Sequence, residues 1–213
     1  MRLPFPDRME AGRRLARLLD EYLDRPDVIV LGLPRGGVPV AYEVARALRA
    51  PLDVFLVRKL GLPGQEELAM GAIASGGVKV INEQLVREAG LRREQIDQVA
   101  TNEVSELHRR EHAYRDHRPA QPLEGRVCIL VDDGLATGST MHAAVISVRA
   151  HEPREVIVAV PVGPAETCAS LQAAADRVVC LASPVPFMAV GTWYEDFRPP
   201  RDSEVRELLN KLR

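Results

Sequence analysis

The sequence is poor in several features that would assign a protein to a class at once. Cysteine is rare, with three residues among 213, and Cys128, Cys168 and Cys180 stand in apolar surroundings without Cys-x-x-Cys spacing. No apolar run has the roughly 20 residues that a membrane-spanning helix needs, and the N-terminus lacks the pattern of a signal peptide. Only three of the 28 basic residues are lysines, and the net charge of −2 provides no overall basic field for nucleic acid. We therefore expect a cytoplasmic protein with buried thiols, and neither a membrane nor a nucleic acid as its partner.

Two common phosphate-binding patterns are absent as well. A Walker A loop has four residues between its glycines, followed by Lys and then Ser or Thr. Here three residues separate Gly134 from Gly138, and no Lys follows. The dinucleotide fingerprint G-x-G-x-x-G is also missing. Any phosphate site in this chain must therefore use another arrangement.

One segment offers such an arrangement. The apolar run 127–131 is typical of a buried strand, and it ends in the paired carboxylates of Asp132 and Asp133. A short loop follows, and then Thr137-Gly138-Ser139-Thr140 opens a helix. Carboxylates accept strong hydrogen bonds from the vicinal hydroxyls of a sugar, and a helix N-terminus favours a phosphate. The segment predicts a sugar-phosphate site, if the chain turns at Gly134 so that both carboxylates face one ribose.

A second candidate anion loop lies near the start of the chain, where Pro34-Arg35-Gly36-Gly37 joins an apolar strand to a helix. The two glycines allow the backbone to approach an anion closely, and the planar guanidinium of Arg35 suits phosphate oxygens. Alone, such a turn is more often only a turn. In an open α/β sheet, however, both loops would lie at the carboxyl edge of the strands, near the topological switch point.

The order of the elements predicts one α/β domain with a parallel sheet and right-handed crossovers. Glycines in 60–77 predict an inserted loop with a hairpin turn at 75–77, and the tail from 183 predicts a cap without further sheet. An Asp7-x-x-Glu10 pattern predicts a helix start. The predicted strands are 28–33, 52–57, 127–131, 155–160 and 177–182, and the later helices are 38–48, 92–117, from about 139, and 164–175.

The run from Val131 to Thr140 strongly resembles the phosphoribosyl pyrophosphate (PRPP) motif of the type I phosphoribosyltransferases. With the turn at 34–37, the resemblance covers most of the chain. It implies an open parallel sheet flanked by helices, with a core at 1–182 that carries an inserted mobile loop at about 58–80. It also implies a small C-terminal hood at 183–213, within a single domain overall.

The resemblance further implies the chemistry. The family displaces pyrophosphate from C1 of PRPP with a nitrogen nucleophile such as a nucleobase, in nucleotide salvage. Mg²⁺ is expected to bind through substrate oxygens and water, with no direct protein ligand, and we expect a homodimer. Because the paired carboxylates end a strand at a loop edge, we also expect their amide variants to leave stability nearly unchanged.

The same resemblance assigns roles to particular residues. The ribose hydroxyls would be held by Asp132 and Asp133, and the 5′-phosphate by Ala136, Thr137, Gly138, Ser139 and Thr140. The pyrophosphate would meet Arg35, Gly36 and Gly37, together with Arg58 or Lys59. The catalytic set would be Arg35, Arg58, Lys59, Asp132 and Asp133.

The acceptor is less well defined. The 6-oxopurine enzymes have an Asp at the position of Ala136, and a Lys near the end of the fourth strand, where this chain has none. The loop is therefore closer to that of the adenine-type enzymes. In the hood, Phe187, Val190 and Trp193 would cover a base, although Trp193 could equally pack the cap or contact another subunit.

Two other interpretations remain. A PRPP-binding regulatory protein could keep this motif without turnover, although the absence of a basic run disfavours the nucleic-acid-binding kind. The run from His108 to His112 matches the H-x-x-E-H pattern of one class of zinc protease. It lies within a dense charge run, which more simply indicates a solvated helix. The roles of Glu66 and Glu67 stay open.

Overall fold

The computed structural model describes residues 3–63, 65–116 and 118–212. Its main sheet has five parallel strands in the order β2-β1-β6-β7-β8. The predicted α/β fold with an open parallel sheet is confirmed. The strands are β1 (Val28–Gly32), β2 (Leu52–Val54), β6 (Val127–Val131), β7 (Glu155–Val162) and β8 (Arg177–Ala182).

Helices cover both faces of this sheet. On one face, α1 (Arg8–Ala16) and α2 (Gly37–Leu48) pack on Val28 and Val30. On the other, α5 (Ser139–Arg149) and α6 (Ala165–Leu171) pack on the alternate residues of β1. Burial on two faces explains why the central strands are continuous apolar runs.

The start of α1 follows its predicted cap. Asp7 Oδ1 accepts a hydrogen bond of 2.7 Å from the Glu10 amide, which satisfies one free N–H of the first turn. The helix ends at Ala16, and a short 3-10 turn η1 (Asp20–Tyr22) continues toward β1.

The segment expected to be a loop is instead a second, antiparallel sheet. Its strands are β3 (Val57–Leu62), β4 (Gln65–Ala74) and β5 (Lys79–Ile81), with the 3-10 turn η2 (Ser75–Gly77) between β4 and β5. The hairpin turn at 75–77 is thus confirmed, and a further turn joins β3 to β4. The predicted strand 52–57 ends early, at Val54, because the chain leaves the main sheet there. Mobility of this segment stays a prediction.

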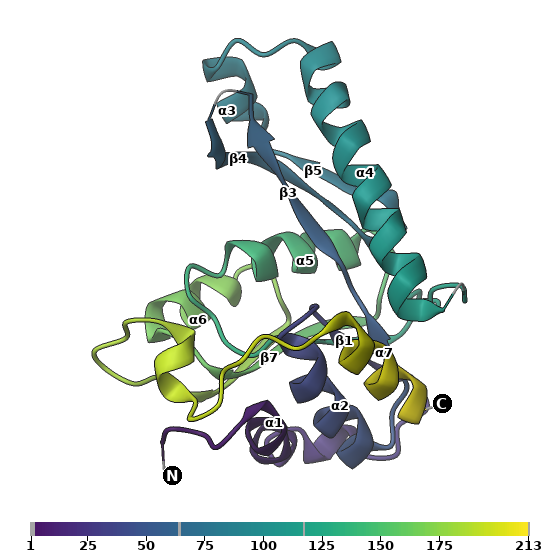
Figure 1. The fold of residues 1–213 in the computed structure, drawn as a ribbon, viewed down its shortest axis with the longest axis vertical. Coiled ribbons are helices and arrows are strands. Elements are labelled where there is room, and N and C mark those ends of the chain that lie inside the picture. The colour runs from purple at the N-terminus through teal and green to yellow at the C-terminus, as the bar shows by residue number, and fades with distance from the viewer. Residues whose placement is uncertain (1–2, 64, 117, 213) are drawn as a thin grey trace.

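Two helices complete this insertion, α3 (Glu83–Glu88) and α4 (Arg93–Arg115). We call residues 57–115 the arm, because they project together from the core (Figure 1). Leu60, Met70 and Ile73 are fully buried in the cluster that also contains Leu107 and Tyr114 of α4. The predicted helix in the charge run is therefore confirmed as α4, and it has a buried apolar face in addition to its solvated one.

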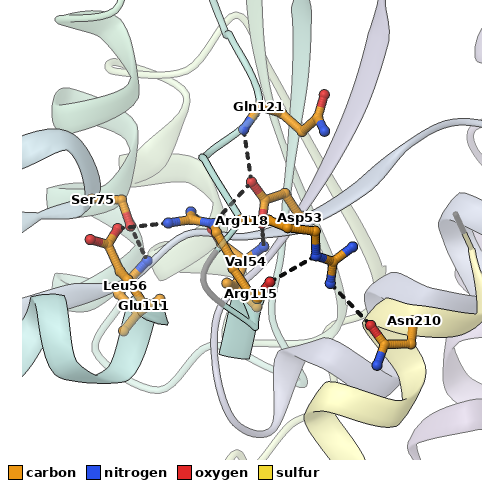
Figure 2. Close-up of polar contacts among 9 residues, drawn as sticks. All are labelled: Asp53, Val54, Leu56, Ser75, Glu111, Arg115, Arg118, Gln121 and Asn210. Atoms are coloured by element: carbon orange, nitrogen blue, oxygen red, sulfur yellow. Dashed lines mark hydrogen bonds and ion pairs between the residues drawn. The ribbon is translucent and has the colours of Figure 1, made fainter. Parts of the chain in front are cut away.

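A buried ion-pair network fixes the foot of α4 to β2 (Figure 2). Arg115 binds Asp53 at 2.9 Å and Glu111 at 3.1 Å, and it donates to the Val54 carbonyl at 2.8 Å. Glu111 is therefore engaged in holding the helix. Within the described residues, no cluster of three or more His, Cys, Asp or Glu side chains could hold a metal.

The C-terminal tail divides into two parts. Residues 183–200, with the 3-10 turn η3 (Val190–Trp193), lie near the ends of the strands and bond to the N-terminal segment, where Phe5 bridges Tyr194. α7 (Asp202–Lys211) packs away from this segment, and a hood at 183–213 stays a prediction. Val205 and Leu209 of α7 are buried in the cluster shared with α2 and α4. Among the described helices, none is long and apolar enough to cross a membrane.

Candidate active site

The two predicted anion loops meet at the switch point of the main sheet. β1 pairs with β2 on one side and with β6 on the other, and Gly32 lies opposite Val131 in the register. Both loops therefore leave neighbouring strands at the same carboxyl edge, as expected for the binding crevice of an open α/β sheet.

The contact between the loops depends on glycine. A Cβ on Gly36 would lie 2.0 Å from Asp133 Oδ2, and one on Gly37 would lie 2.6 Å from the Val131 carbonyl oxygen. Both distances are far below ordinary contact, so only glycine fits beside the acidic pair. The first loop is closed by a hydrogen bond of 3.0 Å from the Gly37 amide to the Leu33 carbonyl. α2 begins at Gly37, and its first turn faces the same crevice.

The paired carboxylates are largely removed from solvent. Burial raises the pKa of Asp132 well above its usual range, and the charge of Asp133 raises it further. Burial also raises the pKa of Asp133, although the Arg8 guanidinium opposes this shift. Asp132 Oδ1 accepts a hydrogen bond of 2.9 Å from the amide of Asp133, which forms the turn between them. Two desolvated carboxylates side by side are costly, which is typical of a functional site.

Arg8 is a site residue that sequence reasoning missed. Its Nε donates to Asp133 Oδ2 at 2.8 Å, and the two side chains are only 9% and 15% exposed. Its guanidinium carbon lies 4.0 Å from the centre of the Phe197 ring, and Nη1 donates to the Arg198 carbonyl at 2.9 Å. Tyr194 donates its hydroxyl proton to the backbone carbonyl of Asp133 at 2.5 Å. α1 and the tail thus fix Asp133 together.

The loop assigned to the 5′-phosphate is open to solvent. Ala136, Thr137, Ser139 and Thr140 are exposed, and Gly138 has a left-handed φ of +73° directly before α5. The amides of the first turn of α5 therefore have no partner within the helix. Thr137 Oγ1 and Ser139 Oγ lie 3.1 Å apart, so hydroxyls and amides converge in the way that a phosphate needs.

α6 supports this loop from behind. Thr167 Oγ1 donates to the Ala136 carbonyl at 3.1 Å. A Cβ on Gly138 would lie 2.7 Å from Thr167 Cγ2. The loop therefore rests directly on the first turn of α6.

Arg58 comes close to both loops, from the arm. It lines a small cavity of about 40 Å³ together with Pro34 and Thr140. Its guanidinium also forms an ion pair of 2.6 Å with Glu103 of α4. Lys59 is exposed on the same strand, and successive residues of a strand point to opposite faces. The structure therefore brings Arg58 to the wall of the site, and leaves Lys59 turned from that wall.

Arg35 is held at the entrance by α7. Its guanidinium lies 3.7 Å from Asp202 Oδ1, and Tyr114 of the arm donates to the same carboxylate oxygen at 2.8 Å. Burial raises the pKa of Tyr114 to about 12, so its hydroxyl stays protonated as a donor. No sequence pattern indicated that α4 and α7 meet at this point.

The hood residues lie in one aromatic cluster. Phe187 and Trp193 stack with ring centroids 6.3 Å apart, and both join the cluster around Phe5 and Tyr194. Val190 reaches furthest toward the acidic loop, since a Cβ on Gly134 would lie 2.6 Å from its Cγ1. The packing of Trp193 is thus visible, and its stacking on a base stays a prediction.

Two larger cavities lie away from these loops. One, of about 710 Å³, is lined by Arg46, Arg49, Arg118 and the C-terminal end of α7. The other, of about 760 Å³, lies between α1, α2 and the 196–211 segment, with Arg8 in its lining. Neither brings the predicted site residues together. We therefore place the site by its chemistry, in the crevice at the switch point, and not by cavity size.

Fold and site together define an α/β protein with a polar crevice, lined by two loops and an acidic pair, at the switch point of a parallel sheet. The family model of the phosphoribosyl transferase domain matches residues 5–195. The chain belongs to this family.

Relatives agree with this assignment. Two curated proteins of Mycobacterium tuberculosis, from strains CDC 1551 / Oshkosh and ATCC 25618 / H37Rv, are provisionally named phosphoribosyl transferases. Each is 49% identical over 207 residues, which cover 97% of this chain and 46% of the relative. This chain thus spans about half the length of these curated relatives. The crystal structure of TT1426 from Thermus thermophilus is similar with a TM-score of 0.87 and 44% identity, over 100% of this chain and 99% of that one.

Proposed function

We propose that this protein transfers the 5-phosphoribosyl group of PRPP to a nitrogen nucleophile, most simply a nucleobase, and releases pyrophosphate. The observation that carries the proposal is the contact between the two loops. Gly36 and Gly37 lie directly against Asp133 and Val131, so an anion on the first loop and a ribose on the acidic pair would be adjacent. PRPP has this same arrangement of pyrophosphate and ribose.

In the proposed reaction, the bond between C1 of the ribose and the pyrophosphate oxygen breaks, and a bond from C1 to the acceptor nitrogen forms. Charge develops on the leaving pyrophosphate and on the ring, so the protein contributes mainly by positioning and by electrostatic stabilisation. Asp132 and Asp133 would orient the ribose hydroxyls, and the start of α5 would hold the 5′-phosphate. Arg35, Arg58 and the amide of Gly36 would receive the pyrophosphate, with Gly37 allowing its close approach while the Gly37 amide bonds the Leu33 carbonyl.

Mg²⁺ fits the donors of this crevice. Asp132 and Asp133 supply hard carboxylate oxygens, which would accept hydrogen bonds from the waters that Mg²⁺ retains, while substrate oxygens would complete its ligands. When bound with PRPP, the ion would neutralise charge on the pyrophosphate. The expected homodimer, the cytoplasmic location and a role in nucleotide salvage are proposals of the same kind, supported by the family alone.

The experiment is a screen for pyrophosphate release from PRPP and Mg²⁺, against nucleobases and simple amines. We expect release only with one acceptor class, and its loss in Asp132→Asn. Release without any acceptor would indicate hydrolysis, and no release with any acceptor would overturn the transferase assignment. Saturable PRPP binding in that last case would instead support the regulatory alternative.

A further inference from the structure

A further arginine reaches the crevice from the long helix of the arm. Arg110 of α4 lines the cavity of about 40 Å³ that is also lined by Arg58, by Pro34 of the first loop and by Thr140 of the second. We propose that Arg110 is a further binding residue for the pyrophosphate of PRPP, and that it acts beside Arg58. The identity of this ligand rests on the proposed function, whereas an anion site at the cavity does not.

One face of α4 is turned toward this cavity. Glu103, Arg110 and Tyr114 recur with helical spacing, so they lie on the same side of the helix. Glu103 binds Arg58 at 2.6 Å, and Tyr114 is buried in the cavity wall. Arg110 lies between these two contacts. The neighbouring Arg109 is turned by about 100° around the helix, and its side chain is 65% exposed, against 42% for Arg110.

The wall of the cavity has one sign of charge. Of the described residues that line it, Arg58 and Arg110 are the only charged ones. Two cations at one small cavity repel each other, and an anion between them removes that repulsion. A volume of about 40 Å³ admits a water-sized group and not a whole diphosphate. The oxygens of one phosphate would therefore enter it, and the rest of the diphosphate would lie outside.

The guanidinium of Arg110 keeps donors for such an anion. Its Nε donates to Glu106 Oε1 at 2.7 Å, and its two Nη groups have no other hydrogen-bond partner among the described residues. Hydrogen bonds from Arg109 and Arg110 lower the pKa of Glu106 to about 2, so this carboxylate stays charged at neutral pH. A guanidinium held in this way through Nε still offers two amino groups, which suit two phosphate oxygens.

The end of α4 that carries Arg110 is fixed to the core. Tyr114 donates to Asp202 Oδ1 of α7 at 2.8 Å, and Arg115 binds Asp53 of β2 at 2.9 Å. Arg110 precedes Tyr114 by about one helical turn. It therefore lies beside the loops without any rearrangement of the arm, and this preorganisation lowers the cost of binding an anion.

The test is a calorimetric titration with inorganic pyrophosphate and Mg²⁺, which needs no acceptor. Arg110→Gln should bind pyrophosphate about tenfold more weakly than the wild type, or weaker still, because one charged hydrogen bond is lost. Arg110→Lys should have an intermediate affinity, since it keeps the charge without the planar fork. The matched control is Arg109→Gln, because Arg109 binds the same Glu106 at 2.7 Å and does not line the cavity. This control should bind pyrophosphate like the wild type.

Urea denaturation of each variant separates binding from folding. Arg110→Gln and Arg109→Gln each lose one ion pair to the same carboxylate, so we expect similar stabilities. Equal affinities in these two variants would overturn the role of Arg110, and so would a wild type that does not bind pyrophosphate. Weaker binding that accompanies a loss of stability in Arg110→Gln, with no rescue by Arg110→Lys, would indicate a structural role and would overturn it too. Arg110-dependent binding with no pyrophosphate release in the acceptor screen would support the anion site and count against the proposed function.

Discussion

Nε of Arg8 donates a hydrogen bond of 2.8 Å to Oδ2 of Asp133, although 125 positions separate the two residues in the chain. The contact joins the first helix to the acidic end of β6. Phe197 covers the guanidinium from the tail side. The acidic pair is therefore fixed by both ends of the chain.

Removal of this partner should destabilise the fold. Arg8→Gln leaves a buried carboxylate without its counter-charge, and we expect the free energy of unfolding to fall by about 3 kcal/mol. Urea denaturation at pH 7.5 measures this. The matched control is Arg109→Gln, whose ion pair with Glu106 is exposed and should contribute little to the free energy of unfolding. Since Arg8 lowers the pKa of Asp133, the deficit should shrink as the pH falls and Asp133 becomes protonated. Equal effects in both variants would contradict a buried role for the pair.

Asp132→Asn should have the opposite effect on stability. Burial and the neighbouring charge raise the pKa of Asp132, so the folded state holds a proton that the unfolded state has already lost. Stability therefore falls as the pH rises above the ordinary Asp range, and the amide removes this loss. We expect a higher free energy of unfolding than the wild type at pH 7.5 and no gain near pH 3, measured by urea denaturation. This replaces the expectation of an unchanged stability.

The same variant should bind PRPP more weakly, by about 1–3 kcal/mol, because PRPP binding selects the deprotonated form of Asp132 as the acceptor for the ribose hydroxyls, and an amide cannot supply that charge. Calorimetric titration with PRPP and Mg²⁺ measures the change. A variant that is more stable and yet binds normally would remove Asp132 from the site.

The two basic residues of β3 should differ in effect. Arg58 lines the cavity shared with Pro34 and Thr140, whereas Lys59 alternates to the other side of the strand. Arg58→Gln should raise the KM for PRPP at least about tenfold, the effect of losing one charged hydrogen bond, and Lys59→Gln should change it little. Steady-state kinetics at fixed acceptor concentration give both values. A larger increase in the KM for PRPP from Lys59→Gln than from Arg58→Gln would show that β3 of the arm reorients when substrate binds.

The acceptor should not be a 6-oxopurine. Ala136 provides no carboxylate to receive a proton from N7 of guanine or hypoxanthine, so we expect both to be poor acceptors beside adenine or a non-purine amine. Parallel assays of pyrophosphate release with each acceptor compare them directly. Efficient turnover of guanine would refute this use of Ala136.

Local patterns were enough to predict the main sheet and the loops. Strand 127–131 and the helix start at Ser139 lie where the sequence placed them, because an unbroken apolar run and a polar turn each reflect local chemistry. The left-handed backbone conformation of Gly138 also has a local cause, because glycine lacks the Cβ that disfavours this conformation.

Non-local contacts were not predictable in this way. Glycines interrupt the alternation of apolar and polar residues that would otherwise indicate strands β3 and β4. The burial of these strands depends on α4, which follows them in the chain. Arg8, Glu103 and Asp202 reach the site from distant segments, and each is an ordinary surface residue in its own sequence context. A pattern that is read within one element carries no information about such partners.

The central claim is that the turn at 34–37 and the acidic loop form one PRPP site. Calorimetric titration of the wild type and of Gly36→Ala with PRPP and Mg²⁺ tests it most directly, because a Cβ on Gly36 would lie 2.0 Å from Asp133 Oδ2. Our account predicts one PRPP per chain for the wild type, and binding weaker by about tenfold or more in a folded Gly36→Ala protein. No saturable binding by the wild type, or equal affinity in the variant, would contradict it.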